Sequence, residues 1–127
     1  MKCKELMVGD LINNLYGVQM RVVKVYDGYA YAAPVNSRKT TWRFDDECEN
    51  PVPIPLTCEI LKKNGWECNE NFMDMKATDN INFSWTDMYG ESLFNNGYHM
   101  CDCKYVHTLQ HVFRLYGLDE LADNFKV

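Results

Sequence analysis

Between residues 11 and 44, hydrophobic and polar positions alternate in short runs, as they do in half-buried β-strands. One run covers 18–26 and the next covers 29–33. Asp27-Gly28 between them predicts a tight hairpin, because both residues tolerate positive φ. A further run covers 40–44. Four or five short strands joined by tight turns predict a small β-barrel of the SH3-like kind.

Three prolines at alternate positions end this strand pattern in the segment 51–57. Proline fixes φ, lacks a backbone N–H donor and favours extended geometry in the residue before it. Neither the interior of a sheet nor a helix can continue through such a segment. Thr57 then suits the N-cap of a short helix over 58–63. We therefore expect 51–57 to connect a β-barrel-like unit at 1–50 with an α+β unit at 58–127, and we leave open whether the two share one core.

The second unit combines helical and strand patterns. Gly65 fits the left-handed position that ends its first helix. Alternating positions predict strands at 73–77 and 81–86. Two more short strands flank Asn95-Asn96-Gly97, which is another hairpin signal.

Hydrophobic residues recur at helical spacing from Tyr105 to Tyr116 and stop at Gly117, which predicts a C-terminal helix. The tail at 118–127 fits either a helical turn or a terminal strand. The whole pattern indicates the α+β class, with a small N-terminal SH3-like β-barrel unit followed by a helix, a short antiparallel sheet and a C-terminal helix.

The composition is typical of a globular protein, with 46% hydrophobic and 13% aromatic residues. No apolar run approaches the roughly 20 residues of a membrane-spanning helix, and we find no signal peptide. We therefore expect a cytoplasmic protein that does not associate with membranes. In a reducing compartment, the six cysteines are expected to be mostly small buried hydrophobic residues and not disulfides. They are Cys3, Cys48, Cys58, Cys68, Cys101 and Cys103.

The net charge of −5 is unevenly distributed. Residues 1–44 contain seven Lys and Arg against three Asp and Glu, whereas residues 45–127 contain six against fifteen. This asymmetry indicates either a surface that binds nucleic acid or two solvated surfaces that attract each other.

Three groups of residues together form a recognisable family pattern. They are Glu5-Leu6 with Gly9 and Leu11; Pro53-Ile54-Pro55-Leu56-Thr57 with Glu59, Leu61, Lys63, Gly65 and Trp66; and Tyr105-Val106-His107 with Leu109, Gln110 and Phe113. In these positions the chain resembles a family of small uncharacterised proteins from gut bacteria and their phages and mobile elements. Gly117 departs from the family pattern, which places a glycine one position later. The resemblance implies an intact cytoplasmic module of phage or mobile-element origin, and it implies no activity.

His107 and His111 lie four positions apart on the predicted C-terminal helix, a spacing that can place two imidazoles on one metal ion. The metalloprotease motif requires Glu at the next position after the first histidine, where this chain has Thr108. The hydrophobic stripe lies on roughly the other side of the helix. We therefore expect both histidines on a solvated face, beside Gln110 and Arg114, with no metal.

His99, Cys101 and Cys103 alternate along a predicted strand, which would place their side chains on one face. With Cys68 or Cys58 they would supply four soft metal ligands. Zinc sites favour paired ligands separated by two to four residues, because one-residue gaps on a strand hold the sulfur atoms apart. We therefore expect ordinary strand packing, with no metal and no cofactor.

The sequence contains no phosphate-binding glycine-rich loop, nucleophile elbow or dinucleotide fingerprint. The carboxylates of Asp45-Asp46-Glu47 have no partner motif and are expected to form a solvated loop. A Cys–His nucleophile pair that uses Cys101 or Cys103 is left open by the sequence. Our prediction is a protein that is not an enzyme and has no catalytic residues.

Interleaved basic and aromatic residues give the strongest functional signal. The basic residues are Arg21, Lys24, Arg38, Lys39 and Arg43, and the aromatic ones are Tyr26, Tyr29, Tyr31 and Trp42. Small barrels that bind single-stranded nucleic acid combine such cations with aromatic stacking platforms. However, Arg21 and Lys24 are three positions apart on one strand, which predicts opposite faces, and the net negative charge disfavours a polyanion.

These arguments predict a binding or accessory module that acts through a protein partner. Single-stranded nucleic-acid binding by the N-terminal unit is the alternative. The sequence identifies neither the partner nor the oligomeric state, and it does not show whether the basic residues form one patch.

Overall fold

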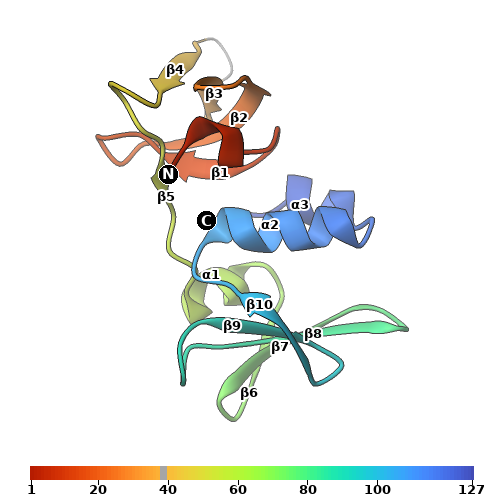
Figure 1. Ribbon diagram of the computed structural model, residues 1–127. Coiled ribbons are helices and arrows are strands. Elements are labelled where there is room, and N and C mark those ends of the chain that lie inside the picture. Colours follow the sequence, from red (N-terminus) through yellow and green to blue (C-terminus); the bar gives the residue numbers. More distant parts are fainter. Residues whose placement is uncertain (38–39) are drawn as a thin grey trace. The chain divides into compact units, whose positions relative to one another are not determined.

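The computed structural model describes residues 1–37 and 40–127, which form two compact units (Figure 1). The first unit comprises Met1–Ile54 and Tyr105–Asn124, and the second comprises Pro55–Lys104 and Phe125–Val127. This division differs from the one expected from the sequence, because the C-terminal helix belongs to the unit of the N-terminal strands. Side-chain contacts between residues 99 to 104 positions apart join them, and no local pattern reveals such contacts.

The first unit contains a curled, five-stranded antiparallel sheet that forms half a barrel, with the strand order β4-β3-β2-β1-β5 (Figure 1). Its strands are β1 (Leu11–Asn13), β2 (Gln19–Val25), β3 (Tyr29–Pro34), β4 (Trp42–Asp45) and β5 (Val52–Pro53), and a short 3-10 helix, η1 (Cys3–Glu5), precedes them. Gly28 has a φ of +89°, and the N–H of Tyr26 donates to the carbonyl of Tyr29, which confirms the predicted hairpin.

One face of this sheet supports a hydrophobic core. Residues less than 5% exposed form it: Cys3, Leu6, Ile12, Met20, Val22, Ala30, Ala32 and Phe44. Ala30 and Ala32 are alternate residues of β3, so the period-2 pattern of the sequence corresponds to the buried face. Tyr29 and Tyr31 therefore project from the opposite face of the same strand.

The proline segment is part of the sheet and not only a connector. Val52 pairs with Asn13 and Pro53 pairs with Ile12, so β5 is an edge strand. Proline is compatible with an edge because the outer side of the strand has no neighbour that requires its missing N–H. The boundary between the units follows Ile54, within the segment 51–57.

Two helices complete the first unit, α2 (Val106–Leu115) and α3 (Asp119–Asp123). For the tail at 118–127 the sequence fitted either a helical turn or a strand, and α3 shows that it contains a helical turn. Gln110 of α2 is completely buried: its Oε1 accepts from the N–H of Leu11 at 2.9 Å, and its Nε2 donates to the carbonyls of Gly9 and Ala122 at 3.0 Å. One side chain thus joins both helices to the start of β1.

The second unit contains a helix and a five-stranded antiparallel meander. The elements are α1 (Cys58–Lys63), β6 (Glu67–Asn69), β7 (Phe72–Thr78), β8 (Ile81–Thr86), β9 (Ser92–Asn95) and β10 (Tyr98–Asp102). Thr57 Oγ1 accepts from the N–H of Ile60 at 3.2 Å, and Gly65 has a φ of +84°, which confirms both predicted ends of α1. No helix in the described part of the chain has the length and apolar composition needed to cross a membrane.

Replacing Gln110 tests the link between β1 and the terminal helices. Gln110→Leu should destabilise the first unit by about 2–4 kcal/mol, because the N–H of Leu11 and the carbonyl of Ala122 lose their partner and the carbonyl of Gly9 loses one of its two donors. Hydrogen exchange measured by NMR should show reduced protection of the Leu11 amide. Gln19→Leu, in β2, is the control and should leave that amide protected. Unchanged protection in Gln110→Leu would contradict this role.

Candidate functional site

The face of the first sheet opposite the core carries a row of cationic and aromatic side chains. Lys24 of β2 pairs with Tyr31 of β3, and Tyr31 pairs with Arg43 of β4, so the three side chains are neighbours on one face. The guanidinium of Arg43 lies 4.9 Å from the ring centre of Tyr29, within the range of a cation–π interaction. We call Lys24, Tyr26, Tyr29, Tyr31 and Arg43 the tyrosine face.

The three tyrosines of this face pack against one another. The rings of Tyr26 and Tyr29 are stacked, with centres 4.6 Å apart and planes at 14°. Tyr31 meets both rings edge-on, at 6.4 and 6.0 Å. Tyr26 is 43% exposed, and the other two are half-buried. The cluster is therefore an ordered aromatic surface that is open to solvent.

A β-bulge corrects the expectation that Arg21 and Lys24 lie on opposite faces. Arg21 pairs with Ala33 and Lys24 with Tyr31, while Val23 is the extra residue where the register shifts. Ala33 and Tyr31 share a face of β3, so the residues paired with them share a face of β2. The expectation was wrong because it assumed uninterrupted alternation. Arg21 Nη1 donates to the carbonyl of Gly9 at 3.0 Å, so its guanidinium stabilises the backbone before β1.

Among the described residues, Trp42 does not join the tyrosine face. Trp42 pairs with Ala32, packs against the core, and donates through Nε1 to Glu49 Oε2 at 2.9 Å. Arg38 and Lys39 lie outside the described residues. Of the seven predicted residues that the structure describes, five are thus brought together.

The acidic loop belongs to the same unit and offsets its basic residues. Asp45 forms an ion pair with Arg43 at 3.6 Å. Asp46 Oδ1 accepts from the N–H of Cys3 at 2.7 Å, and this hydrogen bond lowers the pKa of Asp46. Glu47 is exposed, as expected of a solvated loop, whereas Asp45 and Asp46 are half-buried and have the partners just described, which the sequence did not reveal. By sequence, the first unit contains eight Lys and Arg against ten Asp and Glu.

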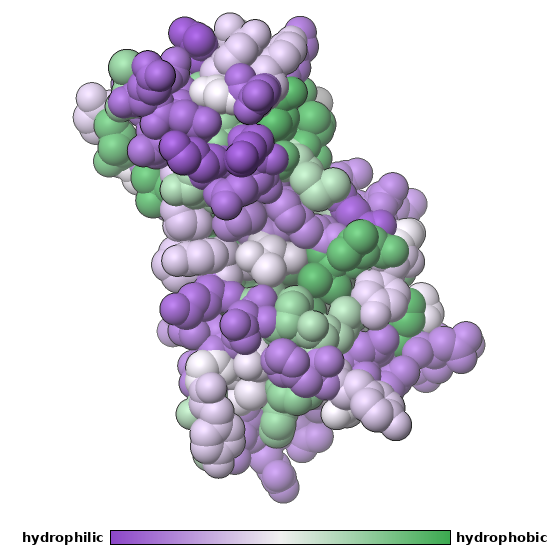
Figure 2. All heavy atoms as spheres, in the orientation of Figure 1, coloured by the Kyte–Doolittle hydropathy of each residue, from purple (hydrophilic) through white to green (hydrophobic). Residues whose placement is uncertain are grey.

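Figure 2 shows where hydrophilic and hydrophobic side chains lie on one side of the molecule. Where β2, β3 and β4 lie, hydrophilic side chains predominate, and hydrophobic ones are visible along the margins. The first unit therefore presents a mixed polar surface, and it carries no excess of positive charge that would attract a polyanion at long range.

The polar face of α2 is largely buried, which contradicts the expectation of a solvated face. Asp10 is completely buried and accepts from Arg114 Nη1 at 2.7 Å and from His111 Nε2 at 2.6 Å. It also accepts from the N–H of Met7 at 2.8 Å. The helical pattern identified the hydrophobic side of α2 correctly, but it did not reveal that a distant carboxylate covers the polar side.

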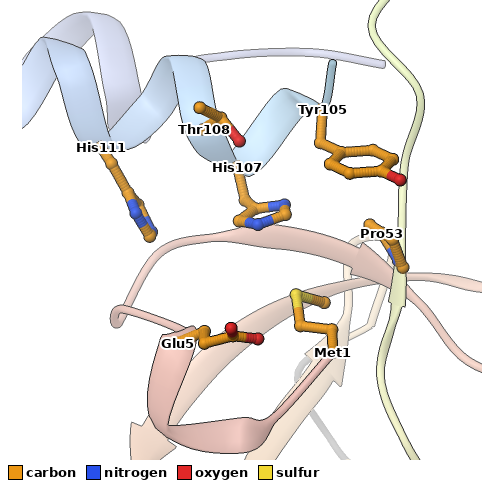
Figure 3. A pocket seen from close by; sticks show the side chains of 7 residues that line it. All are labelled: Met1, Glu5, Pro53, Tyr105, His107, Thr108 and His111. Atoms are coloured by element: carbon orange, nitrogen blue, oxygen red, sulfur yellow. The ribbon is translucent and has the colours of Figure 1, made fainter. Parts of the chain in front are cut away.

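His107 lies on the same face of α2 and lines a pocket with His111, Glu5 and Met1 (Figure 3). Its side chain is buried, and its ring meets that of His111 edge-on at 5.5 Å. Burial lowers the pKa of His107, because the charged imidazolium loses its hydration.

A second β-bulge lies between His99 and Cys101, which were expected to share one face of their strand with Cys103. His99 pairs with Phe94 and Cys101 pairs with Leu93, so their side chains lie on opposite faces of β10. The expectation of one shared face was wrong. Among the described residues, no three His, Cys, Asp or Glu side chains are grouped so that they could hold a metal ion.

The cysteines are all free, but they differ in burial. Cys3 and Cys103 are completely buried, whereas Cys48 and Cys68 are exposed. The predicted role as buried hydrophobic residues therefore applies to the first pair and not to the second. Burial also raises the pKa of the Cys3 thiol to about 11, which disfavours the reactive thiolate.

In comparisons with protein-family models, curated proteins and solved structures, nothing matches this chain. The resemblance to the family of gut-bacterial and phage proteins therefore stays a prediction.

Lowering the pH from 7 to 5 should destabilise the first unit, in part through His107. Its pKa in the folded protein lies below the 6.5 of an unperturbed histidine, chiefly because of burial; Asp10 and Glu5 oppose this shift and His111 adds to it. The unfolded chain then binds more protons in this range. The contribution of His107 is complete above pH 6.5 and is lost as the pH falls through the folded-state pKa.

Urea unfolding midpoints at several pH values measure this effect. His107→Gln should flatten the pH dependence, whereas His99→Gln, at an exposed position of β10, should preserve it. An equal pH dependence of the wild type and His107→Gln would show that other groups are responsible.

Proposed function

We propose that this chain is a binding module without enzymatic activity, and that the tyrosine face contacts a protein partner. The main support is the ordered cluster of Tyr26, Tyr29 and Tyr31 beside Arg43. Tyr and Arg are enriched among residues that dominate binding energy, because they combine large contact areas with hydrogen-bonding groups. Stacking also holds the tyrosine rings in place before binding, which reduces the entropy lost on association.

The charges of the tyrosine face favour a partner with both apolar and acidic side chains. Arg43 is already paired with Asp45. Lys24 is exposed, and no carboxylate of the described residues lies within 4.0 Å of its amino group. A carboxylate of the partner would pair with Lys24, while apolar side chains would pack on the tyrosine rings.

Three further parts of the proposal rest on the sequence. An SH3-like relationship is supported by the half-barrel sheet of short antiparallel strands. A phage or mobile-element origin is supported by the family resemblance described above. A cytoplasmic location fits the six free cysteines, which a reducing compartment would maintain.

Paired substitutions test the tyrosine face. Tyr26→Ser combined with Tyr29→Ser should weaken binding of a purified partner by about 10-fold or more, because the apolar contact area is lost. Tyr98→Ser combined with Tyr89→Ser removes two tyrosines that are 80% and 89% exposed in the second unit, and it should leave affinity unchanged. Affinities would be measured by isothermal titration calorimetry after capture and identification of the partner.

The charge of the face is tested separately. Lys24→Glu should reverse the preference for an acidic partner and weaken binding, with a larger loss at low salt because Debye screening is weaker there. A partner that binds the tyrosine double variant and Lys24→Glu as tightly as the wild type would contradict the proposed surface.

Single-stranded nucleic-acid binding by the same face is the second candidate. It is favoured by the β-bulge of β2, which places Lys24 beside Tyr31 and Arg43 on one face. Fluorescence anisotropy with a labelled oligonucleotide at low salt would test it, and Lys24→Glu combined with Arg43→Glu should abolish the signal. No anisotropy change for the wild type at low salt would exclude this candidate.

A further inference from the structure

A pocket of about 430 Å³ in the first unit shares no residue with the tyrosine face. Tyr105 and His107 project into it from the start of α2, and Met1 and Glu5 approach from the opposite side (Figure 3). Pro53 of β5 lies across from the Tyr105 ring at one end. The pocket thus combines ring surfaces, a thioether and a carboxylate within one compact unit.

The α2 side of the pocket is formed by two nearly parallel rings. The planes of Tyr105 and His107 differ by 13°, and their centres are 5.8 Å apart. Such a surface suits a planar ligand, because an aromatic ring stacks well on tyrosine. His111 also lines the pocket. Its ring meets that of His107 edge-on, and Asp10 holds it in place.

His107 has unused hydrogen-bonding capacity in this pocket. The residue is only 9% exposed, yet its Nδ1 is buried without a hydrogen-bond partner among the described residues. Nε2 has no hydrogen-bond partner within residues 1–37 and 40–127 either, but it is not fully buried, so it is the ring nitrogen that a ligand in the pocket can reach. A ligand that hydrogen-bonds to Nε2 would therefore give the imidazole a partner that the described residues do not supply.

Glu5 supplies an acceptor for N–H donors. Its Oε2 accepts from the N–H of Lys2 at 2.8 Å, which holds the carboxylate in place, and its Oε1 has no partner among the described residues. A carboxylate binds two adjacent N–H groups in parallel. No lysine or arginine of the described chain lines the pocket and competes for it.

The surrounding charges favour a neutral ligand over a cation. Asp10 is already paired with His111 and Arg114 and is not free to bind a cation, and the first turn of α2, which lines the pocket, presents the positive end of the helix dipole. A neutral planar ring with two adjacent N–H donors and a separate acceptor meets every requirement. Guanine has these groups, whereas the corresponding edge of adenine combines a donor with an acceptor that a carboxylate repels.

We propose that this pocket binds a guanine base, which stacks on Tyr105, donates its adjacent N–H groups to Glu5 and hydrogen-bonds to Nε2 of His107. The inference goes beyond the proposed protein-binding function and does not depend on the tyrosine face. The base could belong to a free nucleotide or to an unpaired nucleotide of nucleic acid, because the same groups are presented in both.

Titration of the full ¹⁵N-labelled chain with guanosine monophosphate tests the proposal by NMR. Amide resonances of Glu5, Tyr105 and His107 should shift saturably, whereas adenosine monophosphate, which has the same sugar and phosphate, should bind about 10-fold more weakly or not at all. Glu5→Gln should weaken guanosine monophosphate binding about 10-fold, since one oxygen acceptor becomes an N–H donor. Glutamine preserves the helix-capping hydrogen bond to Lys2, so the fold is retained.

Glu47→Gln is the matched control, because it removes the same charge at an exposed position outside the pocket and should leave binding unchanged. Equal affinity for the two nucleotides, no saturable shift with either, or full binding by Glu5→Gln would overturn the proposal. Saturable shifts with L-arginine amide and none with guanosine monophosphate would overturn it as well, by assigning the pocket to a guanidinium.

Oligonucleotides distinguish the two sources of the base. A short single strand with one guanine that binds more tightly than guanosine monophosphate, and more tightly than its adenine counterpart, would support the site and assign it to nucleic acid. Binding of the nucleotide but not of the single strand would support the site and assign it to free nucleotides. A single strand that shifts the amide resonances of Glu5, Tyr105 and His107 regardless of its guanine would contradict recognition of the base, whereas shifts confined to the tyrosine face would assign that binding to the other surface and leave the nucleotide titration to decide.

Discussion

The buried carboxylate of Asp10 is the interaction on which the first unit depends. It is completely buried, and Arg114 and His111 of α2 both pair with it, so removal of either partner would leave a buried charge poorly compensated. Gly9 before it has a φ of +94°, and a Cβ there would lie 2.7 Å from Nη2 of Arg114. Position 9 therefore requires glycine, because α2 packs closely against it. Gln110 of α2 adds a hydrogen bond from the N–H of Leu11, two residues further along.

The first unit carries both surfaces that we consider functional, the pocket beside α2 and the tyrosine face. Because Asp10, just before β1, holds α2 in place, Tyr105 at the N-cap of α2 and His107 in its first turn line the same pocket as Glu5. The tyrosine face lies on β2, β3 and β4, and the hairpin at Gly28 supports its stacked rings. A single small unit thus offers an aromatic contact surface and a separate polar pocket, which can be tested independently.

Two β-bulges show how a single extra residue alters an interpretation of function. The bulge at Val23 brings Lys24 beside Tyr31, and the bulge between His99 and Cys101 separates two side chains that alternation places together. A strand reverses its face with each residue, so one unpaired residue shifts every position beyond it. Alternation therefore predicted the strands but not the composition of either candidate site.

The sequence by itself determined the local elements: the hairpin at Asp27-Gly28, the cap at Thr57, the end of α1 at Gly65 and the hydrophobic stripe of α2. These features depend on φ preferences, capping and periodicity within a few residues. Only the tertiary structure decided that α2 belongs to the N-terminal unit and that its polar face is buried. The partners of that face are about a hundred residues away, and a polar side chain looks the same in a sequence whether water or a distant carboxylate surrounds it.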